Sequence, residues 1–568
     1  MIQQRIEKLV RDAVDLSRDD GVFAFEGEIE VEISVPRAGA HGDFATSVAL
    51  ALAGRAGKKP RELADAIVAR IRKGAPEIES VAIAGPGFIN FVVRPGFYLE
   101  VLHEIHAAGD KFGRLDIGKG KKLQVEFVSA NPTGPLHIGH GRGAVYGDVL
   151  GNVMAAAGYE VTKEYYVNDA GGQIRTLGRS VWLRMKELRG ERIEFPQECY
   201  QGHYIVDIAR ELKVARHSKL ESMNEDEAIE FCGELAGDRI LAEIKRDLAE
   251  TGVIHDTYFF EQKLHTGSDV ESAINYLKSR GHIYEQDGAL WFRSTAFGDD
   301  KDRVLKKGDG QLTYFAADIA YHKNKYERGF DRVIDVWGAD HGGYVARMKA
   351  AVEALGYDAA SFDAVLIQLV NLVRGGEAVS MSTRSATYET LEDVRRDVGR
   401  DACRYFFLMR SHNAQLDFDL ELARKTTPDN PVFYIQYAHA RICSIFRKAA
   451  EQELYPPESS DVDVSLLNLP EEPKLARMLC DYPGIIGECA LELEPHKLAF
   501  YLLELARMFQ SYYSKGRADS RYMVVSDDGP RARAKLYLLK NLQIVLQNGL
   551  KILGVSAPPE MSREEEDV

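Results

Sequence analysis

Residues 125–143 read VEFVSANPTGPLHIGHGRG, and this stretch decides how the fold is interpreted. It begins as an apolar strand, passes through a turn rich in proline and glycine, and leads into Ala144–Ala157, where apolar residues recur at helical spacing. A helix start exposes unpaired backbone N–H groups and the positive end of the helix dipole, so a phosphate chain can lie there. The stretch therefore predicts a strand, a loop and a helix whose amino-terminal end binds an anion.

Two histidines mark the predicted helix start. His137 and His140 are three residues apart and would fall on one face of the first turn. Their imidazoles could donate hydrogen bonds to a nucleotide as charge moves onto its leaving phosphates, while Gly139 leaves room for a ring against the backbone. A chance match in a glycine-rich helix start is one alternative, and a pair of zinc ligands is another. The lack of a nearby Glu or Cys ligand set disfavours zinc.

This stretch resembles the HIGH signature of class I aminoacyl-tRNA synthetases, and residues 126–135 (EFVSANPTGP) are similar to arginyl-tRNA synthetases in particular. The resemblance implies an α/β Rossmann-like catalytic domain with an N-terminal α+β domain and a C-terminal all-α helical bundle. It implies a ligase that activates L-arginine with ATP to arginyl-adenylate and transfers the arginyl group to the 3′ end of tRNA(Arg). It also implies Mg²⁺ accompanying ATP, and no structural metal is expected.

Composition sets further bounds on this chain of 568 residues. A hydrophobic fraction of 45% and a charged fraction of 28% are ordinary for a soluble protein of three or four domains. No apolar run could span a bilayer and no signal-peptide pattern opens the chain, so we expect a cytoplasmic monomer without a membrane partner. Six scattered cysteines signal neither disulfides nor zinc, and most are expected to be small buried hydrophobes. The net charge of −15 means that RNA must be held by local basic patches.

Residues 1–115 are predicted to form a small α+β domain. Helices are expected over 2–16, 43–53 and 60–71, a half-buried strand over 28–35, and two short strands over 80–93. The domain resembles the one that arginyl-tRNA synthetases use against the elbow of the tRNA, and the resemblance assigns RNA contacts to Phe44 and Asn90. Phe44 could equally be a core aromatic.

Residues 116–398 are predicted to carry the chemistry. A strand over 161–167 and a helix after the turn at 168–173 continue the α/β alternation, which indicates a doubly wound parallel sheet with its ligand at the carboxyl ends of the strands. The GxGxxG fingerprint is missing, which disfavours a hydride-transfer enzyme. Residues from about 180 to 300 are interpreted as an insertion without chemistry, containing a long helix over 225–251 and a hairpin over 282–293.

A candidate arginine site follows the insertion. Asp318 lies four residues after Tyr314, so on a helix the two share a face. A carboxylate supplies a bidentate partner for a guanidinium, and an aromatic ring supplies a flat surface for its plane. A surface Asp beside a core Tyr is the alternative. The resemblance assigns the substrate arginine to Glu126, Ser129, Asn131, Tyr314, Asp318 and His341.

Two further motifs fit a nucleotide site. A strand over 332–337 ends in GADHGGY, similar to the GxDH element of class I synthetases, where a carboxylate can accept both ribose hydroxyls. After a predicted strand over 364–373, residues 379–385 match the KMSKS loop in position, with Ser380 and Thr383 in place of its lysines. Arg384 is then the expected catalytic cation, with Arg374 as the alternative. The expected ATP contacts are Pro132, Thr133, His137, Gly139, His140, Gly338, Asp340, Met381 and Ser382.

Residues 399–568 are predicted to be nearly all helix, over 401–409, 431–451, 473–491, 496–514 and 531–553. The region resembles the DALR-type anticodon-binding bundle, with Asp401-Ala402-Cys403-Arg404 as its tetrapeptide. Tyr434 and Tyr437 could stack unpaired bases, although either could be a core residue. The resemblance places polar readout at Gln436 or Arg441, and phosphates at Lys515, Arg517 and Arg521.

Two rival functions remain open at this point. One is a class I synthetase for another amino acid, and Asp318 is the residue that distinguishes an arginine enzyme from it. The other is a non-catalytic tRNA-binding paralogue, prompted by Ser380 and Thr383. The intact histidine pair and the GADH element favour an active enzyme.

Overall fold

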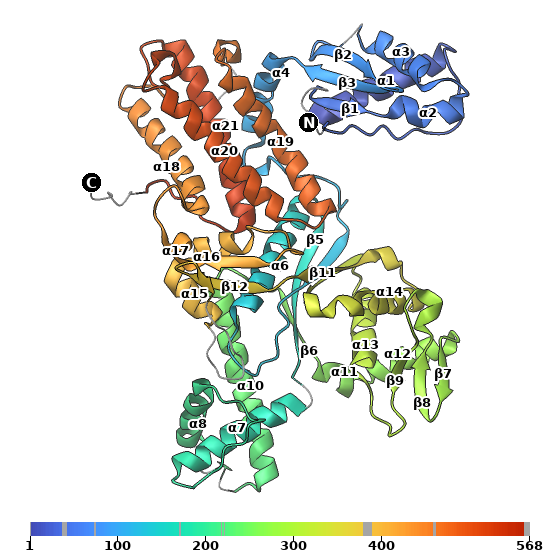
Figure 1. The fold of residues 1–568 in the computed structure, drawn as a ribbon, viewed down its shortest axis with the longest axis vertical. Coiled ribbons are helices and arrows are strands. Elements are labelled where there is room, and N and C mark those ends of the chain that lie inside the picture. The colour runs from blue at the N-terminus through green and yellow to red at the C-terminus, as the bar shows by residue number, and fades with distance from the viewer. Residues whose placement is uncertain are drawn as a thin grey trace. The chain divides into compact units, whose positions relative to one another are not determined.

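The computed structural model describes residues 2–36, 42–72, 75–169, 172–216, 219–220, 222–378, 389–457 and 462–561. The chain divides into two compact units, each built from segments distant in sequence (Figure 1). One unit comprises residues 1–112, 441–483 and 505–546. The other comprises residues 113–440, 484–504 and 547–568.

A five-stranded parallel sheet forms the centre of the second unit, in the order β11-β10-β4-β5-β6. The predicted doubly wound parallel sheet is therefore confirmed. Because all five strands run in one direction, their carboxyl ends share one edge, where ligands bind in such folds. The bounds are β4 Lys122–Glu126, β5 Glu160–Val167, β6 Thr257–Phe260, β10 Arg332–Gly338 and β11 Phe362–Ile367.

Helices connect these strands. The connections contain α6 Ile138–Ala156, α7 Gly172–Leu188, α13 Tyr314–Glu327 and α14 Val345–Ala354. Helix α6 lies close against the end of β4 at Gly147, where an added Cβ would sit 2.2 Å from Cγ of Phe127. Only glycine permits that approach, so Gly147 sets how closely the predicted anion-binding helix packs on its strand.

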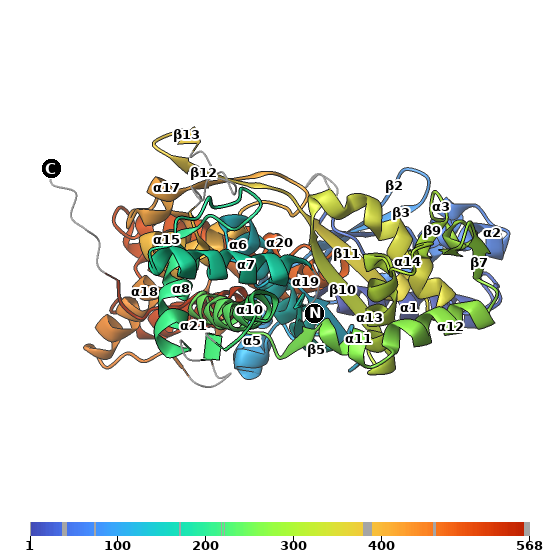
Figure 2. The same ribbon diagram turned by 90° about the horizontal axis from the view of Figure 1, so that it is seen from below.

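The segment interpreted as an insertion contains a strand of the main sheet that the sequence did not predict. β6 lies beside β5, because the backbone pairs Glu164 with Thr257 and Val167 with Phe260. Before β6, helices α8 His203–Ala215 and α10 Glu225–Glu250 pack with α7 (Figure 2). After it come α11 Gln262–Thr266, α12 Asp269–Ser279 and a small antiparallel sheet of β7 Ile283–Gln286, β8 Ala289–Phe292 and β9 Arg303–Lys306. The predicted long helix and hairpin are confirmed.

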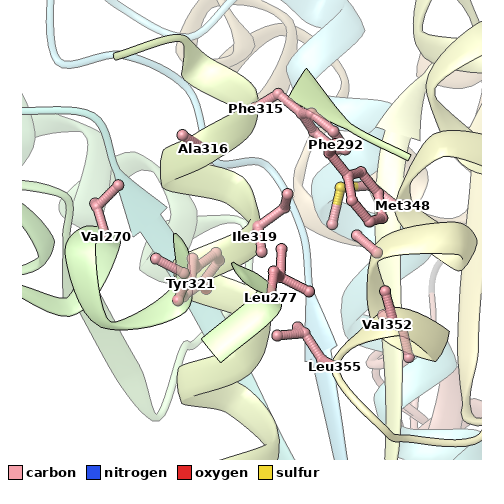
Figure 3. Close-up of a cluster of buried hydrophobic side chains, with 14 of the residues drawn as sticks. Val270, Leu277, Phe292, Phe315, Ala316, Ile319, Tyr321, Met348, Val352 and Leu355 are labelled. Carbon is pink, nitrogen blue, oxygen red and sulfur yellow. The ribbon is translucent and has the colours of Figure 1, made fainter. Parts of the chain in front are cut away.

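Helix α13 is anchored by an apolar face. Phe315, Ala316 and Ile319 lie in a buried cluster with Leu277 of α12, Phe292 of β8, and Met348, Val352 and Leu355 of α14 and its end (Figure 3). Burial of these side chains holds the helix against the small sheet and α14. Lys325, two turns after Asp318 on the same side of the helix, contacts Glu126 and Asp335 of the main sheet.

The single strand predicted over 364–373 is wrong, because the structure has two strands there in different sheets. β11 ends at Ile367, and β12 Val370–Arg374 pairs with β13 Glu377–Ala378 and with β14 Leu416–Asp419. Between them the Gln368 backbone N–H donates to the His412 carbonyl, and Leu369 is 72% exposed. β14 is itself a strand inside the region predicted to be nearly all helix. The helices nearby are α15 Leu391–Val398, α16 Arg400–Phe407 and α17 Leu420–Arg424.

The amino-terminal part of the first unit is an α+β layer. Its sheet has the order β1-β3-β2, with β1 Phe44–Thr46, β2 Ile78–Ala84 and β3 Phe88–Val93. Its helices are α1 Ile2–Asp19, α2 Val48–Ala56, α3 Pro60–Ile71, α4 Pro95–Glu100 and α5 Leu102–Ala108. The helix predicted over 43–53 is wrong at its start, since residues 44–46 pair with β3. Residues 28–35 form one bridge, between Ser34 and Ala45, rather than a full strand.

The carboxy-terminal helices are confirmed close to their predicted bounds. They are α18 Pro431–Ala450, α19 Glu471–Leu491, α20 His496–Lys515 and α21 Gly529–Leu553. Pro483 lies inside α19, and its missing N–H removes one helical hydrogen bond. The chain leaves the first unit at this residue and enters the second unit at Gly484. Within the ranges that the structure describes, no helix has both the length and the apolar composition needed to cross a membrane.

Candidate active site

The predicted histidine pair forms the cap of α6. His137 is the N-cap residue, and its Nδ1 accepts the backbone N–H groups of Gly139 (3.1 Å) and His140 (3.4 Å). The His137 N–H donates in return to Nδ1 of His140 at 3.3 Å, and the two rings stack with centroids 3.6 Å apart. Because each Nδ1 is an acceptor, the ring proton of each histidine is on Nε2.

Burial keeps both imidazoles neutral. It lowers the pKa of His140 to about 3, with a smaller contribution from His137, and it also lowers the pKa of His137. The positive end of α6 disfavours the imidazolium form in the same direction. The pair can therefore act at neutral pH as two Nε2–H donors next to the exposed amides of a helix start, which suits a developing anion.

A cavity of about 290 Å³ opens at this helix start. One wall is the loop between β4 and α6, and the other comes from the segment before and at the start of α8. Tyr204 Oη donates to the Thr133 carbonyl at 2.7 Å and ties the walls together. The lining residues are Ala130, Asn131, Thr133, Gly134, Pro135, His137, His140, Tyr200, Gln201, Gly202 and Tyr204. Residues 200–204 were missed in the sequence, because they match no motif and lie in a segment assigned no chemistry.

The loop leaves β4 through a strained turn. Val128 and Ser129 have φ values of 70° and 42°, a left-handed conformation that a β-branched residue rarely adopts. The turn is held by Ser129, whose Oγ donates to Glu126 Oε1 at 2.9 Å and accepts the Tyr166 N–H at 3.1 Å. It brings Asn131 to the cavity, where its Nδ2 donates to Gln173 Oε1 at 2.6 Å.

Glu126, the last residue of β4, is buried and paired with a lysine that the sequence did not single out. Lys325 Nζ of α13 lies 2.5 Å from Glu126 Oε2 and 2.7 Å from Asp335 Oδ1 of β10. Burial raises the pKa of Glu126, and the charge of Lys325 opposes that rise. Burial alone would lower the pKa of Lys325, but the two carboxylates together raise it. Lys325 is thus a buried ammonium shared by two strands.

Asp318 lies in the first turn of α13, as predicted, with a partner that the sequence did not reveal. Tyr344 Oη donates to Asp318 Oδ2. Burial raises the pKa of Asp318, while the bond from Tyr344 lowers it. Tyr314, at the start of the helix, is 78% exposed, which leaves its ring faces accessible. Asp318 is half-buried and its carboxylate accepts from one hydroxyl, which suits recognition of a cation.

The GADHGGY element forms a turn of 3₁₀ helix, η4 Ala339–Tyr344, at the carboxyl end of β10. Gly338, Asp340 and His341 are exposed, and Asp340 Oδ2 lies 3.7 Å from His341 Nε2. These side chains lie at the ligand-binding edge of the sheet, as predicted. Pro132 of the β4–α6 loop is buried, whereas Thr133 and Gly139 are half-buried.

Residues 390 and 391, which follow the KMSKS-like segment, are hydrogen-bonded to the backbone at the histidine pair. Thr390 forms a backbone bridge with His137, and the Leu391 N–H donates to the Leu136 carbonyl at 2.8 Å. Arg374, the alternative cation, pairs with Glu389 at 3.0 Å. The residues predicted within the segment itself, Ser380, Met381, Ser382, Thr383 and Arg384, lie outside the described residues.

The residues predicted to contact tRNA divide by exposure. Phe44 is 5% exposed, so it is a core aromatic and the expected RNA contact of its ring is corrected. Asn90 in β3 is half-buried, as are Tyr434 and Tyr437 in α18. Gln436 is buried, and its amide donates to Asp401 Oδ2 at 2.8 Å and to the Ser556 carbonyl at 3.0 Å, which corrects its expected role in base readout.

The candidate phosphate ligands of the helical region differ in their partners. Arg441 donates to Gln510 Oε1 and lies over the Tyr513 ring at 5.1 Å. Lys515 is paired with Glu471, and Arg521 with Asp519 at 2.7 Å. Arg517 is exposed. Binding of a phosphate at Lys515 or Arg521 would therefore replace an ion pair within the chain.

Most of the cysteine thiols are buried in the structure. Five of the six cysteines are buried, and burial raises the pKa of Cys232 and of Cys403 to about 12, so these thiols stay protonated. In the described ranges, no three His, Cys, Asp or Glu side chains gather closely enough to hold a metal ion.

Three family models match successive parts of the chain. Residues 1–93 match the arginyl tRNA synthetase N terminal domain, residues 102–407 the class I (R) tRNA synthetase catalytic domain, and residues 435–561 the DALR anticodon binding domain. Together the three models account for most of the described chain. The catalytic model alone spans more than half of it.

Curated relatives extend over nearly the whole chain. The arginine–tRNA ligase of Syntrophotalea carbinolica is 51% identical over 99% of this chain and 100% of its own length. The arginine–tRNA ligase of Desulfosudis oleivorans is 48% identical with the same coverage of both. The solved arginyl-tRNA synthetase of Thermus thermophilus aligns with a TM-score of 0.73 at 24% identity, covering 99% of this chain and 100% of that one.

Proposed function

The chain belongs to the arginine–tRNA ligase family, and from that premise we propose which of its residues carry the reaction. It activates L-arginine with ATP and transfers the arginyl group to tRNA. An oxygen of the arginine carboxylate attacks the α-phosphorus of ATP, and pyrophosphate leaves. A ribose hydroxyl at the 3′ end of the tRNA then attacks the arginyl carbonyl, and AMP leaves.

The phosphates are assigned to the amino-terminal end of α6. The Nε2–H groups of His137 and His140 donate to phosphate oxygens as negative charge moves toward pyrophosphate, and the helix amides add to that stabilisation. This role is supported by the mutual capping of the two rings, which leaves Nε2 as the donor in each. Little covalent chemistry is asked of the protein, so positioning and charge stabilisation dominate.

The arginine is assigned to the carboxyl end of β4 and the first turn of α13. Its guanidinium pairs with Asp318 against the exposed ring of Tyr314, and its α-ammonium pairs with Glu126. We assign Ser129, Asn131 and His341 to contacts with the α-amino and carboxylate groups of the arginine. The observation that carries this assignment is the contact of Lys325 with Glu126, because Lys325 lies two turns after Asp318 on the same helix.

The remaining ATP contacts are assigned to three places. Pro132, Thr133 and Gly139 line the helix start, Gly338 and Asp340 take the ribose, and Met381, Ser382 and Arg384 belong to the KMSKS-like segment outside the described residues. Arg374 is the less favourable cation, since it would have to leave Glu389. Mg²⁺ is proposed to enter on the phosphates of ATP, where it keeps most of its waters.

For tRNA, we assign the anticodon to the helical region and the elbow to the amino-terminal domain, with Asn90, Tyr434, Tyr437 and Arg441 as contacts. The proposed domains are residues 1–115, 116–398 with an insertion at about 180–300, and 399–568. The proposed state is a cytoplasmic monomer, in keeping with relatives that are translation enzymes.

Asp318→Asn tests the arginine site. Asparagine keeps an acceptor for Tyr344 but loses the charge, so the KM for arginine should rise by about ten- to a hundredfold, the equivalent of about 1.5–3 kcal/mol for a charged hydrogen bond. The KM for ATP, measured in the same pyrophosphate exchange assay with tRNA present, should stay within twofold. Glu327→Gln, an exposed carboxylate at the other end of α13, is the matched control. Equal small changes in both KM values would overturn the assignment.

A further inference from the structure

Three buried carboxylates form a row across the main sheet. Glu164 of β5, Glu126 of β4 and Asp335 of β10 are register partners on adjacent parallel strands. Partners in a parallel pair project from the same face, so all three carboxylates lie side by side. They are 0%, 7% and 1% exposed respectively. Like charges at this spacing repel strongly when buried, so the row requires compensation from another element.

Helix α13 and the residue after it supply that compensation. Arg328 forms two hydrogen bonds with Glu164, at 2.5 and 2.8 Å, and Tyr321 Oη donates to the same carboxylate at 2.6 Å. Lys325 bridges Glu126 and Asp335. These residues are spaced by three or four, which places them on one side of the helix. The helix therefore docks on the sheet through Arg328 and Tyr321 on Glu164 and through Lys325 on both Glu126 and Asp335.

His322 completes the connection to the proposed guanidinium site. Its Nε2 lies 2.9 Å from Asp335 Oδ2, and its Nδ1 lies 2.8 Å from the Asp318 carbonyl oxygen. A carbonyl oxygen only accepts, so Nδ1 of His322 donates to it. Lys325 thus bridges Glu126 and Asp335 from within α13, and His322 links Asp335 to the backbone of Asp318.

We propose that Lys325 is a positioning residue for arginine: it fixes the Glu126 carboxylate relative to Asp318, so that both ends of the substrate meet pre-set partners. This inference rests on the roles proposed above for Glu126 and Asp318. Lys325 donates to Glu126 Oε2 and Ser129 donates to Oε1, so the carboxylate is held in one orientation. Each carboxylate oxygen can accept a further hydrogen bond, which leaves acceptors for the ammonium of the substrate.

Docking of α13 alone does not account for Lys325. The helix already buries an apolar face against α12, β8 and α14 (Figure 3), and a buried ion pair adds little to stability after desolvation. Buried charges instead fix one arrangement among several that apolar packing would tolerate. Within the row, Glu126 is the carboxylate with the largest exposed fraction, so it is the one available to a ligand.

Lys325→Met tests the proposal. The KM for arginine should rise by about tenfold or more, since misplacement of a binding group by about 1 Å can cost a hundredfold, and the KM for ATP should stay within twofold. Arg328→Met is the matched control. Arg328, the residue after α13, pairs with the buried carboxylate of Glu164 on β5 and makes no hydrogen bond with Glu126. Its loss should therefore lower the melting temperature with little change in the KM for arginine.

A double variant separates positioning from simple charge balance. Lys325→Met with Asp335→Asn removes one cation and one anion together, so folding should recover toward the wild-type melting temperature. Glu126 still lacks its Lys325 partner in this variant and keeps only Ser129, so the KM for arginine should stay raised. If the KM for arginine returns to the wild-type value with the melting temperature, Lys325 serves folding alone and the proposal is overturned. The double variant also provides the measurement if Lys325→Met does not fold.

A pH profile supplies a readout that a purely structural role would not move. Glu126 faces Lys325 and His322 from α13, Asp335 from β10, and Glu164 from β5. Without Lys325 the remaining carboxylates and burial favour its protonated form, which cannot pair with an ammonium. In Lys325→Met the pKa of Glu126 is raised further, so the KM for arginine should fall as pH rises, more steeply than in the wild type. A profile parallel to wild type would contradict the proposal. If Asp318→Asn raises the KM for arginine while Lys325→Met does not, only the positioning inference fails.

Discussion

Replacement of His140 by asparagine or alanine separates the two tasks that the structure gives this residue. Its Nδ1 accepts the His137 N–H at 3.3 Å, which caps α6, and its Nε2–H is the proposed donor to the phosphates. Asparagine places Oδ1 at the position of Nδ1, so it keeps the acceptor but has no donor at the distance of Nε2. Alanine removes both groups.

The expected magnitudes differ for stability and for rate. The cap hydrogen bond contributes about 1 kcal/mol, and the ring stack at 3.6 Å contributes about 0.5–1.5 kcal/mol. His140→Ala should therefore lose about 2 kcal/mol of unfolding free energy, and His140→Asn about 1 kcal/mol. Loss of one donor to a developing anion costs about 2.7–4 kcal/mol, so both variants should form adenylate roughly a hundred- to a thousandfold more slowly.

Three measurements on each variant decide the outcome: single-turnover adenylate formation with tRNA present, tRNA affinity, and urea unfolding. The rate should drop equally in the two variants, tRNA affinity should stay within twofold, and only the urea midpoint should distinguish them. Adenylate formation at the wild-type rate in His140→Asn would refute the role of Nε2. A parallel loss of rate and tRNA affinity would show that His140 serves folding instead.

Three further outcomes are expected. Gly147→Ala should lose about 1–3 kcal/mol of stability because its Cβ would meet Phe127 at 2.2 Å, whereas Gly143→Ala, with nothing within 4 Å, should be neutral or stabilising; equal urea midpoints would contradict this. Tyr344→Phe removes the donor to Asp318 and should raise the KM for arginine by about three- to tenfold at an unchanged KM for ATP. The pKa of His140, about 3 against an ordinary 6.5, means that the unfolded chain binds the extra proton, so stability should be lost as pH falls below about 6.5. His140→Asn should flatten that loss in urea titrations, and an unchanged slope would contradict the neutral imidazole.

The local parts of this fold and site could be predicted from the sequence. The strand, loop and helix of residues 125–157 follow from apolar spacing and from the Pro/Gly turn between them, and the face shared by Tyr314 and Asp318 follows from helical geometry alone. The parallel sheet follows from α/β alternation. Each of these features depends on residues a few positions apart.

The features that could not be predicted depend on contacts between distant residues. Lys325 meets Glu126 across 199 positions, and Tyr204 meets Thr133 across 71. β6 has only four residues and is defined by its pairing with β5. The break between β11 and β12 depends on the contact of Gln368 with His412. The family resemblance assigned an RNA contact to Phe44, with a core position as the alternative, and the pairing of its strand with Phe91 decides for the core.

A crystal structure of the protein with a bound non-hydrolysable arginyl-adenylate analogue would locate the phosphoryl group and the guanidinium together. The analogue spans both proposed subsites in one molecule. Its phosphoryl oxygens should lie within hydrogen-bonding distance of the amino-terminal end of α6 and the two histidines, with its guanidinium on Asp318 and its ammonium on Glu126. An analogue bound with its guanidinium away from Asp318, or with its phosphoryl group away from α6, would contradict the account.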